Sequence, residues 1–145
     1  MVIDASTMTE GSVYHLRMLY TIPIEFCHSY DPTEPIEGDN LGVCQGGLLG
    51  GLLDNCMSLA IGMVTGGRFR TTVQMSTRFL KPTRSGKVYA QAVVENTTGR
   101  TAYARVFLFS DLEFSDLTAT ADCVGALRVP PPKTTEVVVP AKAKL

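Results

Sequence analysis

A long apolar segment, residues 41–64, constrains the fold more than any other part of the chain. It contains the stretch GVCQGGLLGGLLDNCMS (42–58), which carries a single carboxylate, Asp54, near its centre. The run is too long for an ordinary strand and predicts a helix over residues 45–64 that is buried nearly all round. A membrane span is disfavoured, because Asp54 at the bilayer centre would cost roughly 2.5–3.5 kcal/mol.

The pattern changes to a period of two after this helix. Between residues 71 and 80, Val73, Met75 and Phe79 alternate with polar side chains, as in a half-buried strand. Turn signals at 82–86 and 96–100 separate further alternating segments. The predicted strands are 13–26, with Pro23 favouring an edge position, 71–80, 87–95, 101–110 and 116–129.

The remaining segments set the domain boundaries. Residues 27–44 hold prolines, glycines and acids and predict a long loop. Three prolines at 130–132 predict the end of a single domain, 1–129, followed by a loosely ordered tail, 130–145. One buried helix followed by antiparallel strands predicts an α+β fold in which a curved sheet wraps the helix. A helix lying on a flat sheet is the alternative, but it would expose leucine and methionine to water.

Charge and cysteine content narrow the function classes. The net charge of −1 and the pI near 6.1 argue against a nucleic-acid partner. Residues 55–94 nevertheless hold six bases and no acid. These bases could bind a small polyanion such as a nucleotide phosphate; the alternative is that they only solvate the ends of the strands. The four cysteines form no closely spaced pair, so zinc or redox chemistry is not indicated. Without a secretion-like N-terminal segment, we expect reduced thiols in a cytoplasmic protein.

The residues themselves suggest chemistry on the predicted helix. Gly46 and Gly47 would present free N–H groups at its positive end, where a carbonyl oxygen can be stabilised. Asp54 is its only acid, and Gly50 and Gly51 leave open space one turn before it. Gly46 and Asp54 are eight residues, or roughly 12 Å, apart along a helix, so one substrate carbonyl cannot meet both in one chain. A shared site in a homodimer is therefore expected. The alternative is a tightly packed helix with Asp54 in an ion pair with a strand arginine.

Several motifs together resemble the PaaI-type thioesterases of the hotdog superfamily. In that family an HGG element opens the central helix, an acid follows nine residues after the histidine, and a later strand ends in aromatic-x-x-Pro followed by a turn glycine. The corresponding elements here are Gln45-Gly46-Gly47, Asp54, and Phe79-Leu80-Lys81-Pro82 with Gly86. The resemblance implies a hotdog fold, an acyl-CoA substrate, and a homodimer that pairs into a dimer of dimers.

The resemblance also implies roles for individual residues. Thr72 matches a Ser or Thr that holds the acid or its water, and Asp39, with Asn40 beside it, matches an asparagine. Gln45 replaces the histidine, which keeps hydrogen bonding but removes proton transfer. Asp39 in place of the asparagine adds a like charge that would raise the pKa of the catalytic acid, or it marks a different position of the water. The CoA phosphates would be met by a group of bases: Lys81, Arg84 and Lys87.

The expected function is hydrolysis of an acyl-CoA thioester, with Asp54 as general base or nucleophile and the Gly46 N–H, helped by Gly47, polarising the carbonyl. No metal or redox cofactor and no membrane partner is implied; coenzyme A enters as part of the substrate. Two alternatives remain: a non-catalytic acyl-CoA-binding or structural hotdog dimer, and a hotdog hydratase or dehydratase. The second alternative lacks a histidine on or near the helix, and His15 and His28 match no family position.

Overall fold

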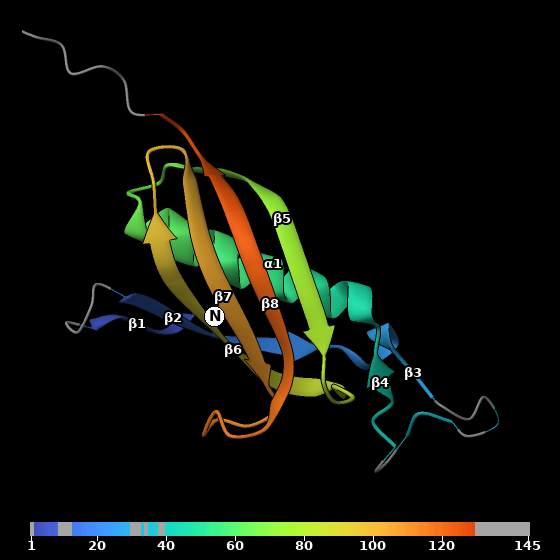
Figure 1. Ribbon diagram of the computed structural model, residues 1–145. Helices are drawn as coiled ribbons and strands as arrows, with labels where there is room; N and C mark the ends of the chain where they lie inside the picture. Colours follow the sequence, from blue (N-terminus) through green and yellow to red (C-terminus); the bar gives the residue numbers. More distant parts are fainter. Residues whose placement is uncertain (1, 9–12, 30–32, 34, 38–39, 130–145) are drawn as a thin grey trace, which may run out of the picture.

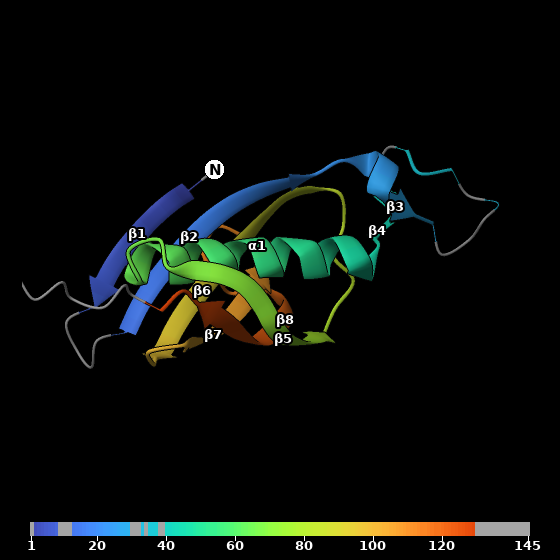
Figure 2. The ribbon, with the colours of Figure 1, turned by 90° about the horizontal axis from the view of Figure 1, so that it is seen from above.

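A single α-helix lies against a curved, six-stranded antiparallel sheet in the computed structural model (Figures 1 and 2). The structure describes residues 2–8, 13–29, 33, 35–37 and 40–129. The helix, α1, spans Gly46–Val64, and the sheet strands are β1 (Val2–Met8), β2 (Val13–Ile22), β5 (Phe69–Phe79), β6 (Gly86–Thr97), β7 (Thr101–Phe109) and β8 (Leu117–Leu127). A 3-10 helix, η1 (Ile24–Phe26), and a two-stranded ladder, β3 (Cys27–His28) with β4 (Val43–Cys44), connect β2 to α1.

The strand order in the sheet is β1-β2-β6-β7-β8-β5, and every neighbouring pair is antiparallel. Strands β6, β7 and β8 follow one another through short connections, as the turn signals predicted. The strand that follows α1, β5, pairs with β8 and forms one edge of the sheet. This is the hotdog arrangement, and the predicted fold class is confirmed.

The core forms where one face of α1 meets the inner face of the sheet. Leu53, Cys56 and Met57 of the helix are fully buried there. Much of the sheet surface beneath the helix is alanine, whose small side chain lets the helix backbone approach closely. The fully or almost fully buried alanines on the strands are Ala90, Ala92, Ala102, Ala104, Ala119 and Ala121.

The opposite face of α1 is open, which corrects the expectation of burial nearly all round. Gly47, Gly51 and Asn55 are exposed, as are Leu59 and Met63 at 41% and 50%. The sheet covers the helix from one side, and no other described element covers the opposite side (Figure 2). By length and composition alone α1 could cross a membrane, but six of its side chains belong to the core.

The N-terminal half of the chain departs from the prediction in three places. Strand β1, which the sequence analysis did not predict, pairs with β2, so β2 is not an edge strand. β2 ends at Ile22, and Pro23 caps η1 instead of lying in the strand, because proline cannot donate to a ladder. Inside the predicted loop 27–44, β3 and β4 form a short ladder.

A bulge in β5 corrects the predicted side-chain alternation. The register between β5 and β8 shifts between Thr72 and Gln74, because an extra residue is inserted on β5. Thr72 and Met75 are therefore half-buried, whereas Val73, predicted on the inner side with Met75, is 62% exposed. The predicted tail, residues 130–145, lies outside the described residues, and the domain boundary at 129 remains a prediction.

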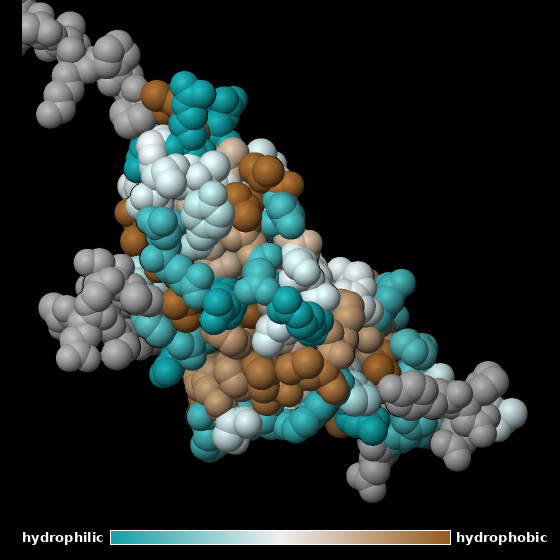
Figure 3. Space-filling model, viewed as in Figure 1, coloured by the Kyte–Doolittle hydropathy of each residue, from teal (hydrophilic) through white to brown (hydrophobic). Residues whose placement is uncertain are grey.

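The outer face of the sheet is mixed in character (Figure 3). Asp122 of β8 forms ion pairs with Arg78 at 2.7 Å and Arg105 at 3.2 Å, and the pKa of its carboxyl lies below the ordinary value chiefly because of the Arg78 hydrogen bond. The guanidinium of Arg17 stacks on the ring of Phe114 at 4.4 Å. These charged groups solvate the face of the sheet opposite the helix.

Candidate active site

Asp54 and Thr72 are brought together across the α1–β5 contact. The Thr72 hydroxyl donates to Oδ1 of Asp54 at 2.5 Å, and both residues are half-buried. The bulge in β5 turns Thr72 toward the helix, which makes this bond possible. Among the described residues Asp54 forms no ion pair, so the alternative of a structural salt bridge to a strand arginine finds no support.

An open groove of about 710 Å³ runs beside Asp54 along the exposed face of α1. A Cβ added at Gly47 or Gly51 would meet no atom within 4 Å, and one at Gly50 would meet only the end of Met75, at 3.8 Å. These glycines therefore leave space and do not serve close packing within the chain. The groove is lined by Gly46, Gly47, Gly50, Gly51, Asp54, Met75, Thr77 and Phe79.

The N-terminus of α1 lies at one end of this groove. Gln45 is the N-cap residue, but its exposed side chain forms no capping hydrogen bond. The N–H groups of Gly46 and Gly47 donate to no described residue, so two helix N-terminal donors are available. At Gly46 a Cβ would lie 3.2 Å from the Phe79 ring, and glycine allows that ring to cover the first turn.

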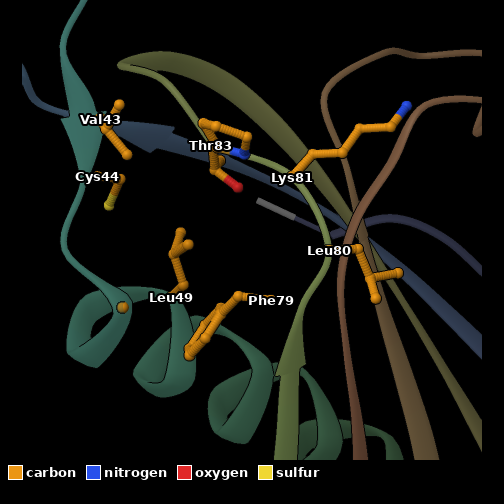
Figure 4. A pocket seen from close by; sticks show the side chains of 9 residues that line it. Val43, Cys44, Leu49, Phe79, Leu80, Lys81 and Thr83 are labelled. Carbon is orange, nitrogen blue, oxygen red and sulfur yellow. The ribbon is translucent and has the colours of Figure 1, made fainter. Parts of the chain in front are cut away.

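A second cavity, of about 340 Å³, lies on the other side of Phe79 (Figure 4). The hydroxyl of Thr83, which is 1% exposed, has no hydrogen-bond partner among the described residues. Burial raises the pKa of the Cys44 thiol, also in this wall, to about 11. The cavity is lined by Val43, Cys44, Gly46, Leu49, Phe79, Leu80, Lys81, Pro82 and Thr83.

The three predicted phosphate-binding bases are not gathered at one point. Lys81 lines the second cavity but forms an ion pair with Asp116 at 2.5 Å. Arg84 donates to the carbonyl of Gly42 at 3.4 Å, and Lys87 is exposed on β6, opposite Thr21 of β2. Neither Arg84 nor Lys87 lines either cavity.

Of the two predicted residues in the preceding loop, only Asn40 can be placed. Its side-chain amide donates to the carbonyl of Pro35 at 2.9 Å and its oxygen accepts from the Gly42 N–H at 3.4 Å, which makes it a loop-ordering residue. Asp39 lies outside the described residues. His15, which matches no family position and was expected to be structural or on the surface, lies 2.9 Å from the Gln91 amide on the neighbouring strand.

Several residues that complete the two cavities were not predicted as site residues from the sequence. Met75 and Thr77 line the groove on the side of β5 that the alternation predicted for Met75, but the alternation did not indicate that a groove lies there. Cys44 and Thr83 are joined by the Cys44 N–H bond to the Thr83 carbonyl, at 2.7 Å. Thirty-nine residues separate them, and no local pattern in the sequence relates the two. Among the described residues no cluster of His, Cys, Asp or Glu could hold a metal ion.

Comparison with known proteins agrees with this geometry. Residues 41–112, about half of the chain, match the family model described as the thioesterase superfamily. The matched segment covers α1, β5, β6 and β7, and with them both cavities. The chain belongs to the thioesterase superfamily. No functionally curated protein matches the sequence significantly.

Solved structures share the fold of this superfamily member at low sequence identity. A candidate thioesterase from Lactococcus lactis is 16% identical with a TM-score of 0.68, over 90% of this chain and 94% of that one. A candidate thioesterase from Ralstonia eutropha, described as related to phenylacetic acid degradation, is 20% identical with a TM-score of 0.60, over 88% and 83%. A Streptococcus mutans protein solved with acetyl-CoA is 17% identical with a TM-score of 0.63, over 87% and 88%.

Proposed function

We propose that the protein hydrolyses an acyl-CoA thioester to the free acid and CoA. The observation that carries this proposal is the Asp54–Thr72 pair beside an open, glycine-lined groove. A half-buried carboxylate without a cation is a liability to folding. A hydrogen-bonded one that faces open space suits a base or a nucleophile.

Asp54 acts as the general base or the nucleophile in this scheme. Thr72 holds Oδ1, and Oδ2 accepts from no described residue, so Oδ2 is free to take a proton from water or to attack the carbonyl carbon. Removal of a proton by a positioned carboxylate contributes typically about 10²–10⁴-fold in rate. Gln45 supplies no proton transfer, because an amide does not titrate.

The oxyanion is stabilised by the N–H groups of Gly46 and Gly47 at the positive end of α1. Asp54 lies two turns further along the same helix, roughly 12 Å away at about 1.5 Å per residue. The Gly46 of a second copy must therefore face the Asp54 of the first. The functional unit in this proposal is a homodimer with two shared sites, and two such dimers pair in turn.

The edge strand β5 is the surface on which we place the dimer contact (Figure 1). Among the described strands it pairs only with β8, and an unpaired edge is a template for another strand. Val73 and Phe79 on β5 are 62% and 52% exposed, and Leu59 and Met63 on the neighbouring open face of α1 are also exposed. Antiparallel pairing of two β5 strands would extend the sheet and cover both helices.

The substrate is proposed to straddle Phe79. The cavity of about 340 Å³ would take the acyl group, since a cavity of about 150 Å³ already holds a benzene ring. The CoA moiety would leave toward Arg84 and Lys87, which form no ion pair with a described residue, whereas Lys81 is already paired with Asp116. One structural neighbour, the Streptococcus mutans protein, was solved with acetyl-CoA bound.

The test measures the release of CoA from a panel of short, medium and aromatic acyl-CoAs. The released CoA is quantified by chromatography, because the four protein thiols would themselves react with a thiol dye. We expect turnover with at least one member and its loss in the Asp54→Asn variant. Binding of CoA esters without any turnover would instead support a non-catalytic acyl-CoA-binding protein. Addition or loss of water at the acyl double bond, without CoA release, would support the hydratase alternative.

A further inference from the structure

Two cysteines face each other across the short ladder that leads into α1. Cys27 of β3 lies directly opposite Cys44 of β4. The next pair along is joined by a bond from the Gln45 N–H to the Phe26 carbonyl, at 3.2 Å, so the two cysteines occupy a non-hydrogen-bonded position of the ladder. Cα atoms at such positions are about 4.5 Å apart, inside the range of about 4.4–6.8 Å found for disulfides.

The two thiols differ in how far they are accessible. Cys27 is half-buried, whereas Cys44 is 4% exposed and lines the cavity beside the N-cap of α1. Burial is the main cause that raises the pKa of both thiols, and the neighbouring Cys27 thiol raises that of Cys44 further. A small disulfide can therefore reach Cys27 first, and Cys44 lies next to it to complete the exchange.

We propose that Cys27 and Cys44 form a reversible redox site, which closes to a disulfide on reaction with a low-molecular-weight disulfide such as glutathione disulfide. The Cys27 thiolate attacks one sulfur of glutathione disulfide, the S–S bond breaks, and the first glutathione leaves as a thiolate and takes up a proton. The Cys44 thiolate then attacks Cys27 Sγ and displaces the second glutathione. Overall, two protein thiols are oxidised and one glutathione disulfide is reduced to two glutathione molecules.

The sequence did not predict this pair, because the two cysteines are seventeen positions apart and form no CxxC motif. The other two cysteines, Cys56 and Cys123, also lie near each other, since the charge of Cys123 contributes to the raised pKa of Cys56. They are 0% and 3% exposed, and a glutathione-sized oxidant cannot reach them in the folded chain. Where disulfides form in reducing compartments they are usually transient, as the Cys27–Cys44 disulfide would be.

The test is mass spectrometry on the full chain after equilibration for hours in buffers of increasing glutathione disulfide, with acid quenching and alkylation. We expect a monomeric chain species that lacks two hydrogens, carries two fewer alkyl groups, and returns to the reduced form with dithiothreitol. Trypsin leaves Cys27, Cys44 and Cys56 in one peptide, 18–68, so a glutamate-specific protease is needed. It cleaves after Glu25, Glu37 and Glu95 but not after Glu34, which Pro35 follows, and should give peptide 26–37 linked to peptide 38–95.

Two variants identify the linked pair, since peptide 38–95 contains both Cys44 and Cys56. Cys27→Ala should abolish the linked species, and Cys56→Ala should retain it. Absence of a linked species at every glutathione ratio, or its loss in Cys56→Ala, would overturn the proposal. The readout needs no substrate, so it stands apart from whether the protein hydrolyses acyl-CoA.

Discussion

At the residue scale, two buried or half-buried polar groups differ in whether they have a hydrogen-bond partner. Asp54 is satisfied by the hydroxyl of Thr72 and faces open space. Thr83 is buried at 1% exposure, and its hydroxyl has no partner among the described residues. The first group is the proposed base or nucleophile, whereas an unsatisfied buried hydroxyl such as the second lowers the stability of the fold.

Replacing Asp54 with asparagine separates a catalytic from a structural role. We expect kcat to fall by at least about 10²-fold, since the amide cannot accept a proton. The thermal midpoint should stay or rise, because no cation is left unpaired and a carboxylate is harder to bury than an amide. Asp122→Asn is the matched control: it breaks two surface ion pairs on the opposite face and should leave kcat unchanged. Early melting of Asp54→Asn with wild-type turnover would make Asp54 structural.

The unpartnered hydroxyl of Thr83 makes a stability prediction. Thr83→Val keeps the shape and removes the hydroxyl, so the free energy of unfolding should hold or rise by up to about 1 kcal/mol. Thr118→Val is the matched control, because Thr118 is also 1% exposed but its hydroxyl donates to the Leu108 carbonyl at 3.2 Å. That variant should lose about 1 kcal/mol. Urea unfolding of both variants gives the comparison, and equal losses would mean that Thr83 has a partner in solution.

At the element scale, β5 both positions a site residue and forms an exposed edge of the sheet. Its inner side carries Thr72 to the acid, and its free edge, which pairs with no described strand beyond β8, carries the exposed Val73. Natural proteins usually protect such an edge with charge, proline or a covering element. An unprotected edge next to the groove is what a strand-paired dimer needs.

A lysine on the edge should therefore separate the subunits. We expect Val73→Lys to shift the mass measured by light scattering from a dimer toward one chain, and CoA release should fall by more than about 10-fold because the charge opposes edge pairing and each site loses its second half. Tyr103→Lys, at a 42% exposed position on the interior strand β7, is the control and should keep mass and activity. A fully active dimer of Val73→Lys would exclude β5 as the contact.

At the scale of the whole molecule, the proposed site shared between two chains makes a prediction about mixed dimers. Asp54→Asn and Gly46→Val are each expected to be inactive, the second because its side chain would press on the Phe79 ring, 3.2 Å from the added Cβ. After subunit exchange in equal amounts, half of the dimers contain one chain of each kind, and one of their two sites is intact. Activity should therefore recover to about a quarter of the wild type. No recovery after verified exchange would place both groups in one chain.

The sequence was sufficient to predict the elements that depend on interactions between residues close together in the chain. The apolar run with Gly46 and Gly47 at its start predicted α1 to within one residue, because a long apolar segment with that many small residues has few other folds available. Alternation and turn residues predicted β6, β7 and β8, and the resemblance placed Thr72 beside Asp54, where the structure has it.

Tertiary structure alone decided what depends on distant pairing. No local sequence pattern predicts the bulge that exposes Val73. The bulge results from the register in which β5 pairs with β8, which lies forty or more residues away along the chain. The second cavity exists because β4 bonds to the loop at Thr83, and the Cys27–Cys44 pair exists because two short segments happen to align in register. Residue type and spacing determine which elements form, since propensity and periodicity act within a few residues. Register, bulges and cavity walls are set by contacts between segments far apart in the chain, and these become definite only when the whole sheet is assembled around its helix.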